Sequence, residues 1–377
     1  MKLAPLRGVA VLATREHGEQ VGDLGVRHGQ FPEGVRPVCV GHLETYRPWC
    51  ATGPDPVGTP GYGRGVNADL VLEGGGVRGI GLVGAVRELD AAGYRFPRVA
   101  GSSAGAVVGS LVAALQKAGE PLSRLEEIVR TIDYRRFRDS SLLGRVPLVG
   151  GLLSLLASDG LYEGEYLESF LTGALGELGV RTFGDLRTGA EPTQHAWSLV
   201  VTASDLSRRR LTRLPWDLPT YGQDPDDFSV ARAVRASAAI PFFFRPVRVA
   251  GATWVDGGLL SGFPIGLFDT SSTPRWPTFG VRLTARPGRP PVTRPVRGPL
   301  SIGLAALETL LNDQDAAYVD DPCTVVRTVF VPADAVSAVD FGITPAQTDA
   351  LFDAGTAAAQ AFLVRWDFPA YVERCRG

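Results

Sequence analysis

Ser103 lies at the centre of Gly101-Ser102-Ser103-Ala104-Gly105, a G-x-S-x-G pentapeptide. In serine hydrolases this pattern forms a tight turn between a strand and a helix, which exposes the serine oxygen as a nucleophile. The partner base is usually a histidine that comes later in the chain. His195 is the only histidine after Ser103, and it lies at mid-chain. If Ser103 is a nucleophile, we therefore expect its base to be a carboxylate.

A glycine-rich run, Gly74-Gly75-Gly76-Val77-Arg78-Gly79, is the second candidate for chemistry. A dinucleotide-binding run of this kind needs an acidic residue about twenty positions on, where this chain has the serine pentapeptide. No Gly-Lys-Ser/Thr follows either, so the run is not a P-loop. Successive glycine amides at a helix start can instead stabilise an oxyanion, and we expect Gly75 and Gly76 to donate. A simple helix-entry turn is the alternative.

Two charged residues accompany these runs. Arg78 is suited to bind an anionic group of a substrate, such as a phosphate; a solvated surface arginine is the alternative. Asp256-Gly257-Gly258 is by itself a common turn. Because Asp256 follows an apolar segment, its burial would raise its pKa and prepare it to accept a proton from Ser103.

Local patterns place these residues between strands and helices. We expect strands at 69–72, 98–100, 197–202, 279–283 and 324–331, a hairpin from 247–249 and 253–255, and helices at 79–92, 104–117, 301–319 and 345–364. For the last helix, Thr344 is the expected N-cap and Pro345 the first helical residue. Alternating strands and helices predict an α/β fold with a mostly parallel sheet.

Composition limits the class of protein. The chain has 377 residues, 45% hydrophobic and 21% charged, with a net charge of −2, which is typical of a globular protein and gives no reason to expect nucleic acid as a partner. Four cysteines in so long a chain suggest no disulfide framework, and neither a signal sequence nor an apolar run of membrane-spanning length is evident. We expect a cytoplasmic protein without a metal site or cofactor.

The three motifs, in this order and spacing, resemble the patatin-like phospholipase family. The matching glycines are Gly74 and Gly79 of the first run, Gly101 and Gly105 beside the serine, and Gly257 and Gly258 after the aspartate. Similarity extends to residues 237–242 and 259–264, although Gly262 stands where many relatives have Asn. The resemblance implies a three-layer α/β fold and a serine acyl hydrolase acting on lipid esters. It implies Ser103 as nucleophile, Asp256 as base, Gly75 and Gly76 as oxyanion donors and Arg78 as a phosphate contact.

Several alternatives stay open at this point. Residues 1–66 form a Gly- and Pro-rich extension of unknown role, 67–285 the expected hydrolase domain, and 286–377 a strand and helices packed on it. The apolar stretch 142–156 is either a lipid-facing lid, which would give peripheral membrane contact, or a connector. Phe242-Phe243-Phe244 either lines an acyl pocket or packs in the core. A catalytically silent binding protein or scaffold of the same fold is the rival function, and nucleotide binding is a weaker one. The oligomeric state and the natural lipid are open.

Overall fold

The computed structural model describes residues 66–134, 136, 164–189, 196–283 and 321–376, together with three two-residue strands nearer the N-terminus. The chain divides into two compact units, Met1–Gly63 and Arg64–Gly377. In the first unit, β1 (Ala13–Thr14) pairs antiparallel with β2 (Gln20–Val21) and β3 (Arg36–Pro37). The second unit contains the three motifs.

An eight-stranded mixed sheet forms the centre of the second unit, in the order β10-β11-β8-β7-β5-β12-β13, with β9 paired to β8. Its strands are β5 (Asp69–Leu72), β7 (Val99–Gly101), β8 (Leu199–Asp205), β9 (Arg210–Leu214), β10 (Val247–Val249), β11 (Ala252–Asp256), β12 (Thr278–Arg282) and β13 (Thr328–Phe330). Five neighbouring strands, β8, β7, β5, β12 and β13, run parallel to one another. The remaining strands, β9, β10 and β11, run antiparallel to the strands they pair with. A separate pair joins β4 (Val66–Asn67) to β6 (Tyr94–Arg95).

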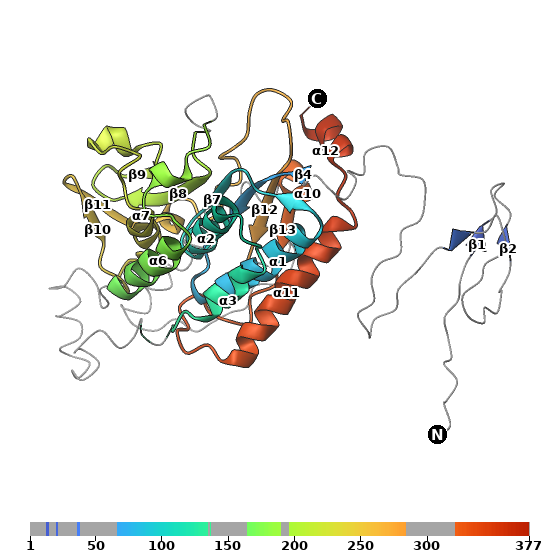
Figure 1. Cartoon of the computed structure of the whole chain (residues 1–377), viewed down its shortest axis with the longest axis horizontal. Coiled ribbons are helices and arrows are strands. Elements are labelled where there is room, and N and C mark those ends of the chain that lie inside the picture. The colour runs from blue at the N-terminus through green and yellow to red at the C-terminus, as the bar shows by residue number, and fades with distance from the viewer. Residues whose placement is uncertain are drawn as a thin grey trace, which may run out of the picture. The chain divides into compact units, whose positions relative to one another are not determined.

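The helices are α1 (Ile80–Ala91), α2 (Ala104–Ala118), α3 (Arg124–Arg130), α6 (Glu165–Glu177), α7 (Val230–Ser237), α10 (Pro322–Val326), α11 (Pro345–Leu363) and α12 (Phe368–Cys375). Short 3-10 helices occupy Gly76–Gly79, Phe183–Leu186, Leu218–Tyr221 and Gly257–Leu259. Figure 1 shows α1 between α3 and the long α11, and α6 beside α7.

Alternate side chains of the central strands enter two apolar clusters, because successive residues of a strand point to opposite faces of the sheet. Leu70, Leu72 and Val99 join the larger cluster, which contains the apolar sides of α1, α2 and α11. Val71, Ala100 and Val200 join a smaller cluster, whose other buried members among the described residues belong to the segment 263–268. The expected α/β fold, with a mostly parallel sheet flanked by helices, is confirmed.

Most of the expected elements are found within a few residues of their predicted limits. One expectation is partly wrong: of residues 324–331, only Thr328–Phe330 form a strand, whereas Pro322–Val326 form α10. The side chain of Asp321 caps this helix and Pro322 begins it, and these start signals prevail over the strand preference of the following β-branched residues. The expected helix at 301–319 lies outside the described residues.

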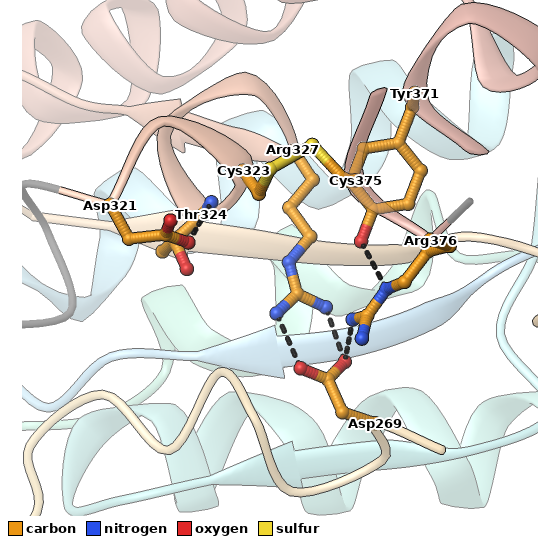
Figure 2. Close-up of a disulfide and its surroundings, with 8 residues drawn as sticks. All are labelled: Asp269, Asp321, Cys323, Thr324, Arg327, Tyr371, Cys375 and Arg376. Carbon is orange, nitrogen blue, oxygen red and sulfur yellow. Dashed lines mark hydrogen bonds and ion pairs between the residues drawn. A yellow bond between two sulfur atoms is a disulfide. The ribbon is translucent and has the colours of Figure 1, made fainter. Parts of the chain in front are cut away.

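A disulfide joins Cys323 of α10 to Cys375 of α12 (Figure 2). The sequence analysis did not pair these cysteines, which lie 52 residues apart. Such bonds persist in oxidising surroundings, so the cysteines no longer support the expectation of a cytoplasmic protein. Within the described ranges, no helix combines the length and apolar character needed to cross a membrane.

Candidate active site

Ser103 lies in the turn between β7 and α2, where its backbone adopts φ 51° and ψ −121°. A positive φ is uncommon for a residue with a side chain, and it occurs where the surrounding structure holds the chain in place. Gly105 allows this turn because a Cβ at its position would lie 2.2 Å from the carbonyl oxygen of Leu72. The close contact between α2 and β5 therefore requires glycine, and the turn has the form of a nucleophile elbow.

The carboxylate of Asp256 lies against this serine. The Ser103 hydroxyl donates a hydrogen bond to Asp256 Oδ2 at 2.7 Å, and both residues are buried, with 5% and 1% of their surface exposed. Asp256 ends β11, and its other carboxylate oxygen accepts a 2.8 Å hydrogen bond from the Gly258 amide. The Asp-Gly-Gly turn thus fixes the carboxylate through its own backbone.

Burial controls the protonation of Asp256. Removal of the carboxylate from water raises its pKa from 3.8 to about 7, although the hydrogen bonds from Ser103 and the Gly258 amide partly oppose this rise. A carboxylate with a pKa near neutrality can take a proton from a hydroxyl and return it in the same cycle. The environment of Asp256 is therefore suited to general acid–base chemistry.

Ser237 holds the elbow from a third direction. Its hydroxyl oxygen, at the end of α7, accepts a 2.8 Å hydrogen bond from the Ser103 backbone amide. Two residues later, the Ala239 carbonyl accepts a 2.9 Å hydrogen bond from the Asp256 amide. One short segment therefore fixes the backbone of both Ser103 and Asp256. The sequence analysis noted this segment, within residues 237–242, as part of the family similarity but gave it no role.

The glycine run forms the turn between β5 and α1. Within the described part of the chain, the amides of Gly75 and Gly76 have no hydrogen-bond partner. Gly76 has a φ of 56°, and a Cβ there would lie 1.9 Å from the carbonyl oxygen of Ala338, so only glycine fits. That carbonyl also accepts a 3.0 Å hydrogen bond from the Val77 amide. The turn therefore holds two available donors in a fixed backbone.

Arg78 is buried rather than solvated, with 9% of its surface exposed. Its Nε donates a 3.2 Å hydrogen bond to the Gly75 carbonyl, which also accepts the Arg78 backbone amide at 3.2 Å. The same planar peptide carries the Gly76 N–H on its opposite side. By holding the Gly75 carbonyl, Arg78 sets the direction of the Gly76 N–H.

The loop after Asp256 is joined to both other motifs. The Gly262 carbonyl accepts a 2.9 Å hydrogen bond from the Gly74 amide. The Ser102 hydroxyl donates to the Ser261 carbonyl at 2.8 Å and lies 2.5 Å from the Thr202 hydroxyl. Backbone carbonyl groups of Ser261 and Gly262 thus hold this loop against the other two motifs.

An apolar pocket of about 590 Å³ opens beside Ser103. It is lined by Gly76, Val77, Gly79, Ser103, Ala104, Val107, Val108, Val129, Ile132, Tyr134, Leu167, Ala238, Ile240, Phe244 and Phe341. Of the three phenylalanines considered for an acyl pocket, Phe244 lines it, Phe243 packs on Phe341, and Phe242 is half exposed. The pocket is lined mainly by apolar side chains, which suits contact with a hydrocarbon chain.

Other sequence-predicted features lie elsewhere. Residues 142–156 and all four histidines, including His195, are outside the described residues. No cluster of three or more His, Cys, Asp or Glu side chains that could bind a metal occurs in the part of the chain that the structure describes. Phe341 and Ala338 were missed by sequence reasoning, because nothing local connects residues so far along the chain with the glycine turn.

Comparisons with known proteins assign the chain to a family by its sequence. A family model described as patatin-like phospholipase matches residues 70–269. The uncharacterized protein YqhO of Bacillus subtilis is 37% identical over 307 residues, which cover 80% of this chain and 99% of that protein. Human calcium-independent phospholipase A2-gamma is 24% identical over 232 residues, which cover 58% of this chain and 27% of that protein.

Among solved structures, VipD from Legionella pneumophila is similar with a TM-score of 0.46 and 16% identity, over 79% of this chain and 66% of that one. The family assignment depends on the sequence matches, which cover more than half of the chain and nearly all of the bacterial relative. The chain belongs to the patatin-like phospholipase family.

Proposed function

We propose that this protein is a serine acyl hydrolase that cleaves carboxylic ester bonds of lipids. The observation that carries the proposal is the 2.7 Å hydrogen bond from the Ser103 hydroxyl to the buried Asp256 carboxylate. A nucleophile needs a base within hydrogen-bond reach, and this pair meets that requirement without histidine. The proposal assigns catalysis to residues 67–285, and residues 286–377 complete the pocket through Phe341.

In the first half of the reaction, Ser103 Oγ attacks the ester carbonyl carbon while its proton passes to Asp256. The tetrahedral intermediate collapses, the bond to the leaving alcohol breaks, and Asp256 gives its proton to the alcohol oxygen. In the second half, Asp256 takes a proton from water as the water oxygen attacks the acyl-enzyme. Ser103 then leaves with that proton, and the free acid is released.

The negative oxygen of each tetrahedral intermediate needs donors that are already in place. The amides of Gly75 and Gly76 are proposed for this role, and each such donor typically contributes about 2.7–4 kcal/mol of transition-state stabilisation. The hydrogen bond from Arg78 to the Gly75 carbonyl makes Arg78 a positioning residue for these amides. Direct contact of Arg78 with a substrate phosphate is the alternative role that the family resemblance implies.

The apolar pocket supports an acyl chain as the group next to the reacting carbonyl. Family membership and the phospholipase name of the human relative favour a phospholipid or lysophospholipid as the substrate. Such a substrate lies in a membrane or micelle, so the protein would touch the lipid surface peripherally.

Purified wild type and the variants Ser103→Ala and Asp256→Asn would be assayed with p-nitrophenyl acyl esters. We expect each variant to lose at least ~10³-fold in kcat, since members of a catalytic pair act as one unit. Ser110→Ala is the matched control, because Ser110 is also buried on the helix that begins after Ser103 and bonds only to the Val107 carbonyl among the described residues. A folded Ser103→Ala protein with wild-type activity would disprove the proposal.

Labelling with a fluorophosphonate separates hydrolysis from the rival role of a silent scaffold. We expect an adduct on Ser103 in the wild type and none in Ser103→Ala. Folded wild-type protein without an adduct would favour the scaffold. Lipid analysis of membranes incubated with wild type or Ser103→Ala would then identify the natural ester.

A further inference from the structure

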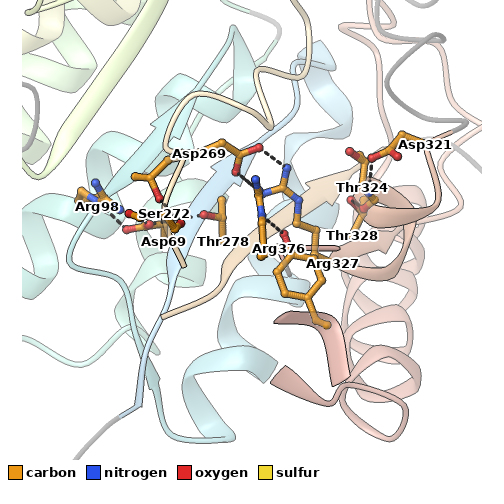
Figure 3. Close-up of polar contacts among 12 residues, drawn as sticks. Asp69, Arg98, Asp269, Ser272, Thr278, Asp321, Thr324, Arg327, Thr328 and Arg376 are labelled. Atoms are coloured by element: carbon orange, nitrogen blue, oxygen red, sulfur yellow. Dashed lines mark hydrogen bonds and ion pairs between the residues drawn. The ribbon is translucent and has the colours of Figure 1, made fainter. Parts of the chain in front are cut away.

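A second pocket, of about 1090 Å³, lies at the opposite edge of the sheet from Ser103. Ser103 follows the carboxyl end of β7. The second pocket is instead lined by residues at the amino ends of parallel strands: Asp69 begins β5, Thr278 begins β12, and Arg98 and Arg327 immediately precede β7 and β13. Figure 3 shows these four residues along one line of the sheet edge. The two pockets share no residue.

Charge distinguishes this pocket from the apolar one. Its charged lining consists of four arginines, Arg98, Arg275, Arg327 and Arg376, and two aspartates, Asp69 and Asp269, which leaves a formal surplus of two positive charges. The first lining pair joins Arg98 Nε to Asp69 Oδ1 at 2.7 Å. Each aspartate is paired with arginines that line the same pocket.

Asp269 is shared between two guanidinium groups. Arg327 binds both of its oxygens, at 2.6 and 2.8 Å, and Arg376 Nη2 lies 2.7 Å from Oδ1. Burial by itself would raise the pKa of Asp269, but the hydrogen bonds and charges of Arg327 and Arg376 outweigh that effect and lower it. One carboxylate therefore faces two cations, and the surplus charge is not compensated by the described residues.

One lining arginine and three buried donor atoms of the lining residues have no acceptor among the described residues. In the described ranges, Arg275 has no carboxylate within ion-pair distance, and its guanidinium lies 5.3 Å from the Trp276 ring centre. Arg98 Nη1, Arg327 Nε and Trp276 Nε1 are buried without a hydrogen-bond partner. Buried donors of this kind normally find an acceptor, and the described residues supply none to these three atoms.

The wall that carries Arg376 is fixed in place. Arg376 follows Cys375 at the end of α12, and the disulfide to Cys323 ties this helix to α10, immediately before Arg327 (Figure 2). The Arg376 Nε donates a further hydrogen bond to the Tyr371 hydroxyl at 3.0 Å. Covalent tethering holds two of the arginines near each other before any ligand arrives, which lowers the cost of binding.

We propose that this pocket binds the phosphate group of a small soluble phosphomonoester. A phosphomonoester carries a charge of about −1.5 to −2 at neutral pH, which matches the surplus, and its oxygens suit the fork of an arginine. The aromatic lining, Phe268, Trp276 and Tyr371, can contact the organic part. The solubility of the ligand is inferred from the proposed function. If membrane esters reach Ser103, the membrane lies at the carboxyl ends of the parallel strands, whereas this pocket lies at their amino ends and is open to a soluble ligand.

Titration calorimetry of the full chain with phenyl phosphate tests this proposal, with phenyl sulfate as the singly charged analogue. We expect wild type to bind phenyl phosphate saturably and to bind phenyl sulfate at least tenfold more weakly. The variants Arg275→Gln and Arg275→Gln/Arg376→Gln should bind phenyl phosphate at least tenfold more weakly than wild type. Arg374→Gln is the matched control, because Arg374 is exposed on α12 outside the pocket; its affinity should stay within twofold of wild type. Arg275 is itself exposed, so its replacement leaves folding intact.

Ser103→Ala separates this site from the catalytic one. This variant should bind phenyl phosphate like the wild type even though it lacks activity. The proposal is overturned if wild type shows no saturable binding, if the Arg275 variants bind normally, or if Ser103→Ala abolishes binding. Flotation of the protein with phosphatidic acid vesicles tests whether the phosphate belongs to a lipid instead. Vesicle binding that requires Arg275, in a protein that does not bind phenyl phosphate, would overturn the assignment to a soluble ligand.

Discussion

Ser103 and Asp256 are 153 residues apart in the chain, yet the serine hydroxyl donates a 2.7 Å hydrogen bond to the aspartate. The mixed sheet brings them together, because the end of β7 and the end of β11 pair with neighbouring residues on opposite sides of β8: Gly101 pairs with Val201, and Asp256 pairs with Ala203. The elbow and the Asp-Gly-Gly turn therefore meet beside this part of β8. The first two predictions below follow from this pair.

Activity should depend on the ionisation of Asp256. Because burial raises its pKa to about 7, kcat/KM for a p-nitrophenyl ester should increase with pH and level off above a midpoint near 7, as the carboxylate becomes able to accept the Ser103 proton. A pH profile of kcat/KM measured on both sides of neutrality checks this. A profile that is flat through pH 7 would contradict the assignment of Asp256 as base.

Asp256 should also make stability depend on pH. Its pKa is about 7 in the folded protein and 3.8 in the reference state, so between these values the folded state binds more protons and the free energy of unfolding decreases as pH rises. The difference corresponds to on the order of 4 kcal/mol at most. Asp256→Asn should remove this dependence and gain stability relative to wild type above pH 7. Urea unfolding of both proteins at several pH values below and above 7 gives the free energy of unfolding as a function of pH. The same pH dependence in wild type and Asp256→Asn would refute the prediction.

The apolar pocket should set the preferred acyl length. Val107 lines it one turn after Ser103, so Val107→Phe should shorten the space and reduce kcat/KM for a decanoate ester relative to a butyrate ester by at least ~10-fold. Val364→Phe is the control, because Val364 is 91% exposed and lies outside the pocket. An unchanged decanoate-to-butyrate ratio in Val107→Phe would place the acyl chain elsewhere.

The Cys323–Cys375 disulfide should stabilise the C-terminal helices. It closes a loop with a sequence separation of 52 residues, and such bonds typically contribute about 2–4 kcal/mol by restricting the unfolded chain. Cys375→Ser should lower the free energy of unfolding by that amount, and a thiol reductant should lower wild type to the same value without affecting the variant. Equal stability of oxidised wild type and variant would count against the bond.

Helix ends could be predicted where the signal is local. Thr344 and Pro345 predicted the start of the last helix, and the structure confirms it with a capping box between Thr344 and Gln347. The start of α10 at Asp321-Pro322 carried the same kind of signal, but the β-branched residues after it were interpreted as a strand. Both outcomes follow from interactions within one turn of chain.

Long-range packing decided the surroundings of the candidate site. The pKa of Asp256 depends on what buries it, and no local pattern encodes that burial. The interpretation of Arg78 changed for the same reason, because its side chain bonds to the Gly75 carbonyl. The contacts of Ala338 and Phe341 with the glycine turn and the pocket join parts of the chain more than 200 residues apart.

The sequence by itself determined the motifs, their order and the alternation of strands and helices, because turns, caps and apolar periodicity act over a few residues. Only the tertiary structure decided that the Ser103 hydroxyl meets the Asp256 carboxylate out of water, that Ser237 holds the Ser103 amide, and that an arginine-rich pocket forms at the far edge of the sheet. These features depend on distances between remote segments, which the folded sheet sets.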